Sequence, residues 1–428
     1  MKLRILLVLA ALIAADFRAF SAGSGEELVP AVECRARGGL PNFISKLKAG
    51  GEVKVAYLGG SITAQEGWRP KTLKWFREQF PNGKVGEINA AIGGTGSDLG
   101  VFRLQYDVLR HKPDLLFVEF AVNDAGAAPE QIYRCMEGIV RKTWKAAPAT
   151  DICFVYTLAG NMLDTLKQDR FPRSASAMEK VADHYGIPSI HMGLEVARME
   201  KAGKLVFSGK QPKTDAEKAG LGDKILFSPD SVHPYDAGHQ LYFEAVVRSW
   251  ESIRRAGEPG AHETGKPLVV DNWERAEMIP LAQAKLSPGW KQLESGASMV
   301  KSFGNRLPGV WSAAAPGESI SFRFRGTTAR IYDLVGPDCG QVTVVVDDQA
   351  PALKPRFDAY CTYHRLATLS VAEGLPEGLH TVKITVHPEQ PDKVKILSQR
   401  GEKMNDPKRF DGTAWYAGAL LLIGDLVE

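Results

Sequence analysis

The stretch "VAYLGGSITAQEGWRP", residues 55–70, begins as an apolar run and breaks at Gly59-Gly60, and Ser61 follows at once. A nearly continuous apolar run of this length, bounded by glycine, is typical of a strand that is buried on both faces of a sheet. Glycine lets the chain turn sharply because it has no Cβ atom. The stretch therefore predicts a buried strand that delivers one serine hydroxyl to the place where it ends.

Short apolar runs of the same kind alternate with amphipathic stretches from Val53 to about Arg255. The runs are VKVAYLG (53–59), VGEINAAI (85–92), DLLFVEFAV (114–122), DICFVYTL (151–158) and IPSIHMG (187–193). Helical spacing occurs at about 69–80, 98–110, 129–147 and 174–185, and again from Asp236 onward. This alternation predicts a doubly wound α/β domain with a central parallel sheet. Residues 203–229 are polar and interrupt the pattern, which predicts an inserted loop or lid.

The chain has 428 residues, more than one hydrophobic core usually supports, so two domains are expected. After a linker rich in Gly and Pro, the apolar period changes from 3.6 to 2, and short strands recur between turn signals. That change predicts a β-sandwich, jelly-roll-like, as a second domain. The expected boundaries are 1–22 for a signal peptide, 23–255 for the α/β domain, 256–267 for the linker and 268–428 for the β-sandwich.

The N-terminus has the pattern of a secretory signal. Lys2 and Arg4 precede an apolar run of eleven residues, too short to span a bilayer, and Ala19-x-Ser21 is an acceptable cleavage site. We therefore expect a secreted or periplasmic protein with no membrane span, since no later segment is long and apolar enough to cross a bilayer. A net charge of +3 without a Lys/Arg cluster gives no case for nucleic acid.

Four polar stretches fall where their side chains should meet. Three lie at the ends of the first three strands, and the fourth comes just before the last helix. They are Gly59-Gly60-Ser61, NAAIGGTGS (89–97), FAVND (120–124) and DSVHP (230–234). Because the carboxyl ends of parallel strands share one edge of a sheet, we expect these stretches to converge there.

Their chemistry is complementary. A serine hydroxyl is a poor nucleophile until a base takes its proton, and His233 is such a base. Asp230 is placed to accept from the histidine Nδ1–H and to orient the ring. The Gly94 N–H, the Asn123 amide and the Ser61 N–H are candidate oxyanion donors, and losing one such donor costs on the order of 3–4 kcal/mol. The expected reason for a glycine at position 94 is that, without a Cβ atom, the backbone can approach the reacting atom.

These stretches resemble the blocks of the SGNH (GDSL-type) hydrolase family, in which Ser, Gly, Asn and His occur in this order. The matching residues are Ser61, Gly94, Asn123 and His233, with Asp230 completing the Asp-x-x-His block. The resemblance covers about residues 53–253 and implies a flavodoxin-like SGNH domain with a Ser-His-Asp triad and no cofactor. The GGSIT form of the first block is similar to that of secreted bacterial hydrolases fused to a β-sandwich, often with carbohydrate substrates.

Two blocks depart from the family pattern beside a catalytic position. Gly59-Gly60-Ser61-Ile62 replaces the usual Gly-Asp-Ser-Leu, and Ala121-Val122-Asn123-Asp124 replaces Gly-x-Asn-Asp. Both exchanges bear on the shape of the substrate more than on catalysis.

The expected function is therefore that of a secreted serine esterase acting on O-acyl groups, O-acetyl above all, of a carbohydrate or polysaccharide. One alternative is a lipolytic acylhydrolase for long-chain esters, and another is a non-catalytic carbohydrate-binding module. The second domain either binds polysaccharide or supports the catalytic domain and its cleft. The expected ligand is an acylated carbohydrate, and no metal is expected, because the chain has no HExxH or Cys/His set.

Residues near these blocks allow two readings each. Trp68 and Arg69 offer an aromatic face and a bidentate cation for a sugar, although Arg69 also suits a structural ion pair. Glu119, inside an apolar strand, is expected to be paired, and Arg103 is one guess for its partner. We expect His239 to pack near the start of the last helix rather than to bind metal.

Five cysteines fit an oxidising compartment only weakly. Cys339 and Cys361 lie in a strand-rich region, where a disulfide between them is one possibility. Cys135 and Cys153 have apolar surroundings and are expected to be buried thiols.

Overall fold

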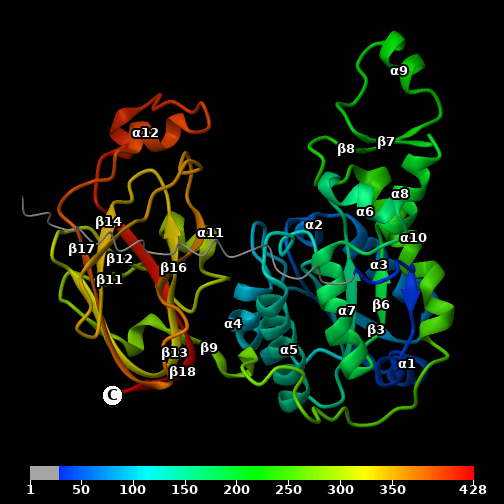
Figure 1. Cartoon of the computed structure of the whole chain (residues 1–428), viewed down its shortest axis with the longest axis horizontal. Coiled ribbons are helices and arrows are strands. Elements are labelled where there is room, and N and C mark those ends of the chain that lie inside the picture. Colours follow the sequence, from blue (N-terminus) through cyan, green and yellow to red (C-terminus); the bar gives the residue numbers. More distant parts are fainter. Residues whose placement is uncertain (1–27) are drawn as a thin grey trace, which may run out of the picture.

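The computed structural model describes residues 28–428, so the predicted signal peptide lies outside the described residues. Figure 1 shows an α/β body and an antiparallel body side by side, with the arm labelled α9 projecting from the former. Within residues 28–428, no helix combines the length and the apolar character needed to cross a bilayer.

The α/β body is built on a six-stranded sheet with the order β1-β6-β5-β4-β2-β3. Every pair is parallel except β1 with β6, which is antiparallel. The strands are β1 (Cys34–Arg35), β2 (Glu52–Gly59), β3 (Lys84–Asn89), β4 (Leu115–Glu119), β5 (Asp151–Tyr156) and β6 (Ser189–His191). The prediction of a doubly wound parallel sheet is confirmed. Only β1, with two residues, had no signal in the sequence.

Helices cover both faces of this sheet. On one face α4 packs against α5, and α5 packs against α7. On the other, an aromatic cluster joins α1, α3 and α10 through Phe43, Phe76 and Trp250. The helices are α1 (Pro41–Lys48), α3 (Trp68–Gln79), α4 (Ser97–Asp107), α5 (Pro129–Ala146), α6 (Leu163–Lys167), α7 (Arg173–Tyr185), α8 (Leu194–Lys201) and α10 (Asp236–Ile253). The five expected helices are all present, whereas α1, α6 and α8 were not expected.

Residues 203–229 form an arm rather than a plain loop. Strand β7 (Leu205–Ser208) pairs in parallel with β8 (Ile225–Ser228), and α9 (Asp215–Leu221) lies between them. Helix α9 begins with a capping box formed by Thr214 and Glu217, and none of its residues is buried. The arm extends away from the central sheet, at the top of Figure 1. Its returning strand β8 leads directly into the stretch that contains Asp230 and His233.

The second body is an antiparallel sheet of ten strands, as the change of period predicts. Its two longest strands, β13 (Ser319–Val335) and β18 (Trp415–Val427), pair with each other. The first half of β13 also pairs with β17 (Gly378–Val386), and the second half pairs with β16 (Arg365–Ala372). The other strands are β9 (Ala276–Pro280), β10 (Lys285–Leu286), β11 (Lys291–Gln292), β12 (Trp311–Ala313), β14 (Gln341–Val346) and β15 (Ala352–Pro355).

The sequence reads 319–326 and 328–336 as two strands, but they form the single strand β13. The register shifts between Gly326 and Thr328, where β13 faces Gly424 of β18. A Cβ at Gly326 would overlap the Ile423 carbonyl and lie 2.7 Å from the Gly424 Cα. Glycine at this point therefore marks a bulge that redirects the strand and not a turn that ends it.

The two bodies share an apolar core. Tyr332, Leu334 and Leu421 of the antiparallel body belong to the same buried cluster as the core of the α/β body. Phe102 of α4 packs on Trp273, with 5.5 Å between ring centroids. The segment expected to be a linker lies along the α/β body, where His262 stacks on Trp144 at 4.7 Å. This continuous packing fixes the position of one body against the other.

The cysteines do not pair. Cys339 and Cys361 are buried free thiols, so the disulfide that the sequence allowed is not formed. Cys135 and Cys153 are buried, as expected, and Cys34 is partly buried.

Candidate active site

The serine stands at the turn between strand β2, which lies between β4 and β3, and a short helix. β2 ends at Gly59, Gly60 is extended with φ −91°, and Ser61 begins α2 (Ser61–Ala64). A Cβ at Gly60 would overlap Oδ1 of Asn123 and lie 2.7 Å from its Cγ. Glycine is therefore required at position 60 because the Asn123 amide occupies the space of a side chain.

His233 and Asp230 reach the serine from the loop between β8 and α10. The Nε2 atom of His233 lies 2.8 Å from the Ser61 Oγ, and the Nδ1 atom lies 2.7 Å from Oδ2 of Asp230. The other carboxylate oxygen of Asp230 accepts from the backbone N–H groups of His233 and Val232, at 2.8 and 3.0 Å. With Nδ1–H donated to the carboxylate, Nε2 is free to accept the serine proton.

The environment keeps Asp230 ionised. Partial burial raises its pKa, but hydrogen bonds from the His233 ring and from two backbone N–H groups outweigh this effect and lower the pKa to about 2. The side chains of Asp230 and His233 are 50% and 35% exposed, so solvent and substrate can reach the pair. A carboxylate therefore faces the imidazole throughout the neutral pH range.

The glycine-rich stretch, here called the Gly94 loop (residues 89–98), lies against the serine. The Ile92 N–H donates to the Gly59 carbonyl at 3.0 Å, and a Cβ at Gly93 would lie 3.5 Å from the Cβ of Ser61. Gly94 has φ +73°, a left-handed conformation that disfavours other residues. A Cβ there would meet no heavy atom of the described chain within 4 Å. The backbone conformation, and not the expected lack of space, explains this glycine.

The structure thus brings Ser61, Gly94, Asn123, Asp230 and His233 to one edge of the sheet. They come from the ends of β2, β3 and β4 and from the loop before α10. The Asn123 amide lies beside Gly60, and the Gly94 loop lies on Ser61. The arrangement provides a nucleophile, a base, an orienting carboxylate and amide donors, which is what acyl transfer requires.

Two buried carboxyl groups support these loops. Asp124 was assigned no role from sequence, and Glu119 was expected only to be paired. Burial raises the pKa of Asp124 to about 7, against hydrogen bonds from Ser97. Its Oδ1 accepts the Ser97 N–H at 3.1 Å, at the start of α4, and its Oδ2 has no hydrogen-bond partner in the described chain. The adjacent Asn123-Asp124 pair was the available signal, since the family block ends in Asp.

Glu119 lies beneath the serine turn. It accepts from the hydroxyls of Thr63 and Thr157, at 2.8 and 2.6 Å. Burial raises its pKa, although these bonds and the Gly60 N–H oppose the effect. The guess that Arg103 pairs with Glu119 is wrong, because Arg103 forms its ion pair with Asp107, at 2.8 Å. Hydroxyl and backbone donors replace the cation that was expected.

Trp68 and Arg69 do not face the site. The Trp68 side chain is fully buried and packs edge-on against Tyr57, with 5.5 Å between ring centroids. Arg69 is 2% exposed and forms ion pairs with Glu66 and Glu87. The expectation that these two side chains bind substrate is therefore corrected, since helix α3 points both of them into the protein.

His239 packs near the start of α10, as expected. It is buried, its Nδ1 accepts the Trp68 N–H at 3.3 Å, and its Nε2 contacts Gln65 Oε1 at 3.1 Å. Burial lowers its pKa to about 4, so the ring is neutral at neutral pH. Its role is to fix the segment that follows the serine.

One cluster in the described chain has side chains close enough to hold a metal ion, and it lies in the antiparallel body. The ligand atoms of Asp338, Cys339 and His364 lie within 4.8 Å of one another. His364 Nε2 is 2.6 Å from Asp338 Oδ1, and Tyr416 donates to Oδ2 at 2.7 Å. Burial raises the pKa of Cys339 well above its usual value, which opposes the thiolate form that metals bind.

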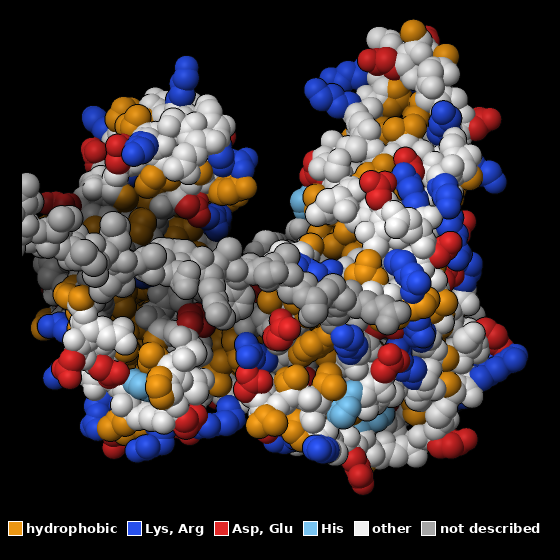
Figure 2. All heavy atoms as spheres, in the orientation of Figure 1, with side chains coloured by type: hydrophobic (Ala, Val, Ile, Leu, Met, Phe, Trp, Pro, Cys, Tyr) orange, Lys and Arg blue, Asp and Glu red, His pale blue; other side chains and the backbone are white. Residues whose placement is uncertain are grey.

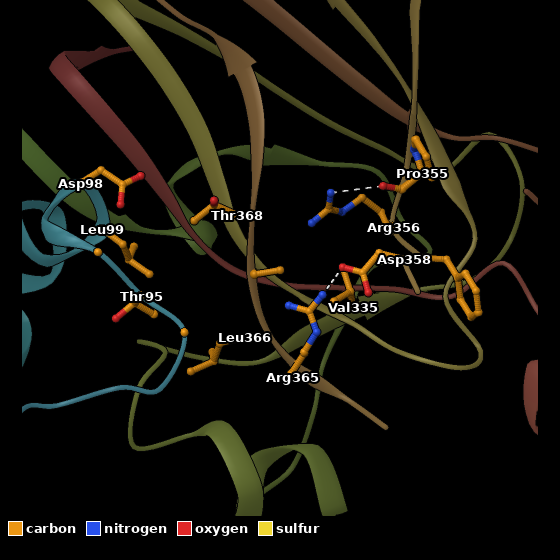
Figure 3. Close-up of a pocket in the computed structure, with 14 residues that line it drawn as sticks. Thr95, Asp98, Leu99, Val335, Pro355, Arg356, Asp358, Arg365, Leu366 and Thr368 are labelled. Carbon is orange, nitrogen blue, oxygen red and sulfur yellow. Dashed lines mark hydrogen bonds and ion pairs between the residues drawn. The ribbon is translucent and has the colours of Figure 1, made fainter. Parts of the chain in front are cut away.

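A cavity of about 330 Å³ lies between the two bodies beside the Gly94 loop. Figure 3 shows Thr95 and Asp98 on its α/β side and Arg356, Asp358 and Arg365 on its antiparallel side. A neighbouring cavity of about 490 Å³ is lined by residues that include Gly94, Asn123, Asp124 and Arg330. Figure 2 shows the surface notched between the antiparallel body and the arm, with positive and negative side chains interspersed. Two of the candidate oxyanion donors, Gly94 and Asn123, therefore border a polar space to which both bodies contribute.

Comparison with known proteins relates the α/β body to one family. The sequence model of the GDSL-like lipase/acylhydrolase family matches residues 57–241. No curated protein matches the chain.

Solved structures share the whole two-body fold. Two structures of a two-domain esterase (CEX) active on acetylated mannans, one co-crystallised with mannopentaose, are 20% identical to this chain. Each match covers 92% of this chain and 96% or 97% of that one, with a TM-score of 0.69. The acetylxylan esterase Axe2 from Geobacillus stearothermophilus is 17% identical over 46% of this chain and 94% of its own, with a TM-score of 0.36. Residues 57–241 of this chain are therefore similar to the GDSL-like lipase/acylhydrolase family, and the chain as a whole shares its fold with a two-domain esterase.

Proposed function

We propose that this protein is a secreted serine esterase that removes O-acetyl groups from a carbohydrate. One observation carries the proposal. The Ser61 Oγ, the two ring nitrogens of His233 and the Asp230 carboxylate form a continuous hydrogen-bonded relay with distances of 2.8 and 2.7 Å. A relay of this geometry converts a serine hydroxyl into a nucleophile.

The proposed reaction proceeds in two halves. Ser61 attacks the ester carbonyl while His233 Nε2 takes its proton, and the oxyanion is held by the N–H groups of Ser61 and Gly94 and by the Asn123 amide. His233 then gives the proton to the leaving alcohol, and an acyl-enzyme remains. Water, activated by the same imidazole, releases the acid. Asp230, with its pKa of about 2, stays ionised and stabilises the imidazolium in both halves.

Two features support a carbohydrate substrate. The interbody cavity offers charged and polar groups, among them Asp98, Asp358 and Arg365, which suit hydroxyl groups. The esterase that shares this fold over both bodies is active on acetylated mannans. A lipolytic acylhydrolase would instead require a wide apolar groove for the acyl chain. The N-terminal segment, with the pattern of a signal peptide, is the basis for proposing export.

The test compares esters and variants of the full chain. Wild-type protein should hydrolyse p-nitrophenyl acetate faster than the octanoate and should release acetate from an acetylated polysaccharide. Ser61→Ala should lose both activities. Faster turnover of octanoate would instead favour the lipolytic alternative. Unchanged hydrolysis by Ser61→Ala would refute the catalytic assignment and leave a binding module as the better description.

A further inference from the structure

The Gly94 loop is attached to the α/β body along its inner side. The N–H groups of Ala90 and Ile92 donate to the carbonyls of Tyr57 and Gly59, each at 3.0 Å. These bonds tie the first half of the loop to the strand that ends at the serine. They leave the carbonyls of Asn89 and Ala91 available on the other side.

Two arginines of the antiparallel body hold the outer side of the same loop. Arg306 follows α11 (Ser298–Phe303) and donates to the carbonyls of Asn89 and Ala91, at 3.4 and 3.2 Å. Arg330 of β13 pairs with the Asp98 carboxylate at 2.8 Å. These contacts lie on the two sides of Gly94 in the sequence. The segment that contains the candidate oxyanion donor is thus held at both ends by the other body.

The Arg330 guanidinium is itself held in place, and so is the backbone beside Arg306. The Arg330 side chain is 13% exposed, forms a second ion pair with Glu373 at 2.6 Å, and lies 5.3 Å from the centre of the Trp273 ring. Arg306 is partly buried and precedes Leu307, which is buried and whose carbonyl accepts from Tyr106 of α4 at 3.4 Å. A side chain that is itself fixed can hold a neighbouring loop in one position, whereas a mobile ion pair on the surface contributes little to holding it.

An oxyanion donor acts only if it already points at the developing charge. Gly94 has no side chain, adopts φ +73° and borders open cavity space. Gly94 therefore has no side-chain contact of its own that could fix the direction of its N–H group. We propose that Arg306 and Arg330 are positioning residues, through which the antiparallel body braces the Gly94 loop for catalysis. The inference rests on the proposed esterase function and adds that the second body contributes to kcat, beyond any contact it makes with a substrate.

The experiment uses p-nitrophenyl acetate, a small ester that needs no sugar contact. Arg306→Met and Arg330→Met should each lower kcat about tenfold, because a donor displaced by a fraction of an ångström loses part of its 10²–10³-fold effect. KM should stay within about twofold. Arg323→Met is the matched control: Arg323 is an exposed residue of the same strand β13 that donates to the Glu428 carbonyl, and kcat should not change. Arg330→Lys, which keeps the charge, should recover part of kcat.

Asp98→Asn breaks the ion pair with Arg330 from the α/β side. This variant tests the same contact if Arg330→Met does not fold. It should lower kcat while the thermal midpoint stays close to that of the wild type, because Asp98 is 44% exposed. Amide hydrogen exchange in a peptide covering 89–98 should speed up in these variants and stay unchanged in Arg323→Met.

Unchanged kcat in folded Arg306→Met and Asp98→Asn would refute the brace. So would an effect confined to KM on polysaccharide. If Ser61→Ala is inactive in the same assay, either result refutes the brace and leaves the esterase function standing.

Discussion

Gly60→Ala should disable the oxyanion site while it leaves the Ser61–His233 pair in place. Position 60 has φ −91°, which alanine adopts without strain, so the backbone tolerates the change. The added Cβ would lie 2.7 Å from the Cγ of Asn123 and overlap its Oδ1. Since carbon atoms pack at about 3.5 Å or more, the amide has to move by about 1 Å.

The size of the effect follows from that displacement. A 1 Å misplacement at a reacting centre can cost about 10²-fold, and removing an oxyanion donor costs about 10²–10³-fold in kcat. We therefore expect Gly60→Ala to lower kcat about 10²-fold, equivalent to about 2.7 kcal/mol. Asn123→Ala should cause a similar loss. The double variant should be no worse than Asn123→Ala alone, because both changes remove the same donor.

The assay is steady-state hydrolysis of p-nitrophenyl acetate, with thermal unfolding to establish that each variant is folded. Gly126→Ala is the matched control. It lies on the same turn as Asn123, and a Cβ there would meet no described atom within 4 Å. If Gly60→Ala kept kcat within about twofold of the wild type, or if the losses of the two single variants simply added, the assignment of Asn123 as an oxyanion donor would be wrong.

Three more results are expected. Asp230 has a pKa of about 2 and therefore stays ionised beside His233, so Asp230→Asn should lower kcat by up to about 10⁴-fold, and an unchanged kcat would contradict this pairing. Burial raises the pKa of Asp124 from 3.8 to about 7. Between these pH values the folded protein keeps a proton that the unfolded chain has released. The free energy of unfolding of the protein should therefore fall as the pH rises from about 4 to about 7, by at most about 4 kcal/mol. Asp124→Asn should flatten this dependence in denaturant titrations at pH 5 and pH 8, and an equal slope in both proteins would exclude Asp124 as its source. Trp68→Ala should destabilise the fold by about 3–5 kcal/mol because the side chain is fully buried, whereas a rise in KM with no loss of stability would restore Trp68 as a substrate contact.

The parallel sheet and the polar edge were predictable because both depend on local sequence. The strands that cross the core are apolar on both faces, and each of the first three ends at a glycine or a polar residue. Since parallel strands end at one edge, Ser61, Asn123 and Gly94 had to approach each other. The approach of His233 depended on the segment between the arm and α10, and the Asp-x-x-His spacing indicated it.

What the sequence did not reveal depends on packing between distant segments. Trp68 and Arg69 follow the serine closely, but the turn of α2 and the start of α3 direct both side chains inward. Glu119 has one hydroxyl partner on helix α2 and another just after β5, and no spacing rule identifies such partners. The contacts of Arg306 and Arg330 with the Gly94 loop exist only because the two bodies dock, and docking follows from shape rather than from a motif.

Covalent labelling tests whether Ser61 is the nucleophile. Wild-type protein is treated with a fluorophosphonate ester, digested, and mapped by mass spectrometry, while residual hydrolysis of p-nitrophenyl acetate is followed in the same sample. The relay from Asp230 through His233 predicts one adduct, on the peptide that contains Ser61, formed in proportion to the loss of activity and absent from Ser61→Ala. An adduct on another residue, or full ester hydrolysis after Ser61 has been modified, would contradict the proposed mechanism.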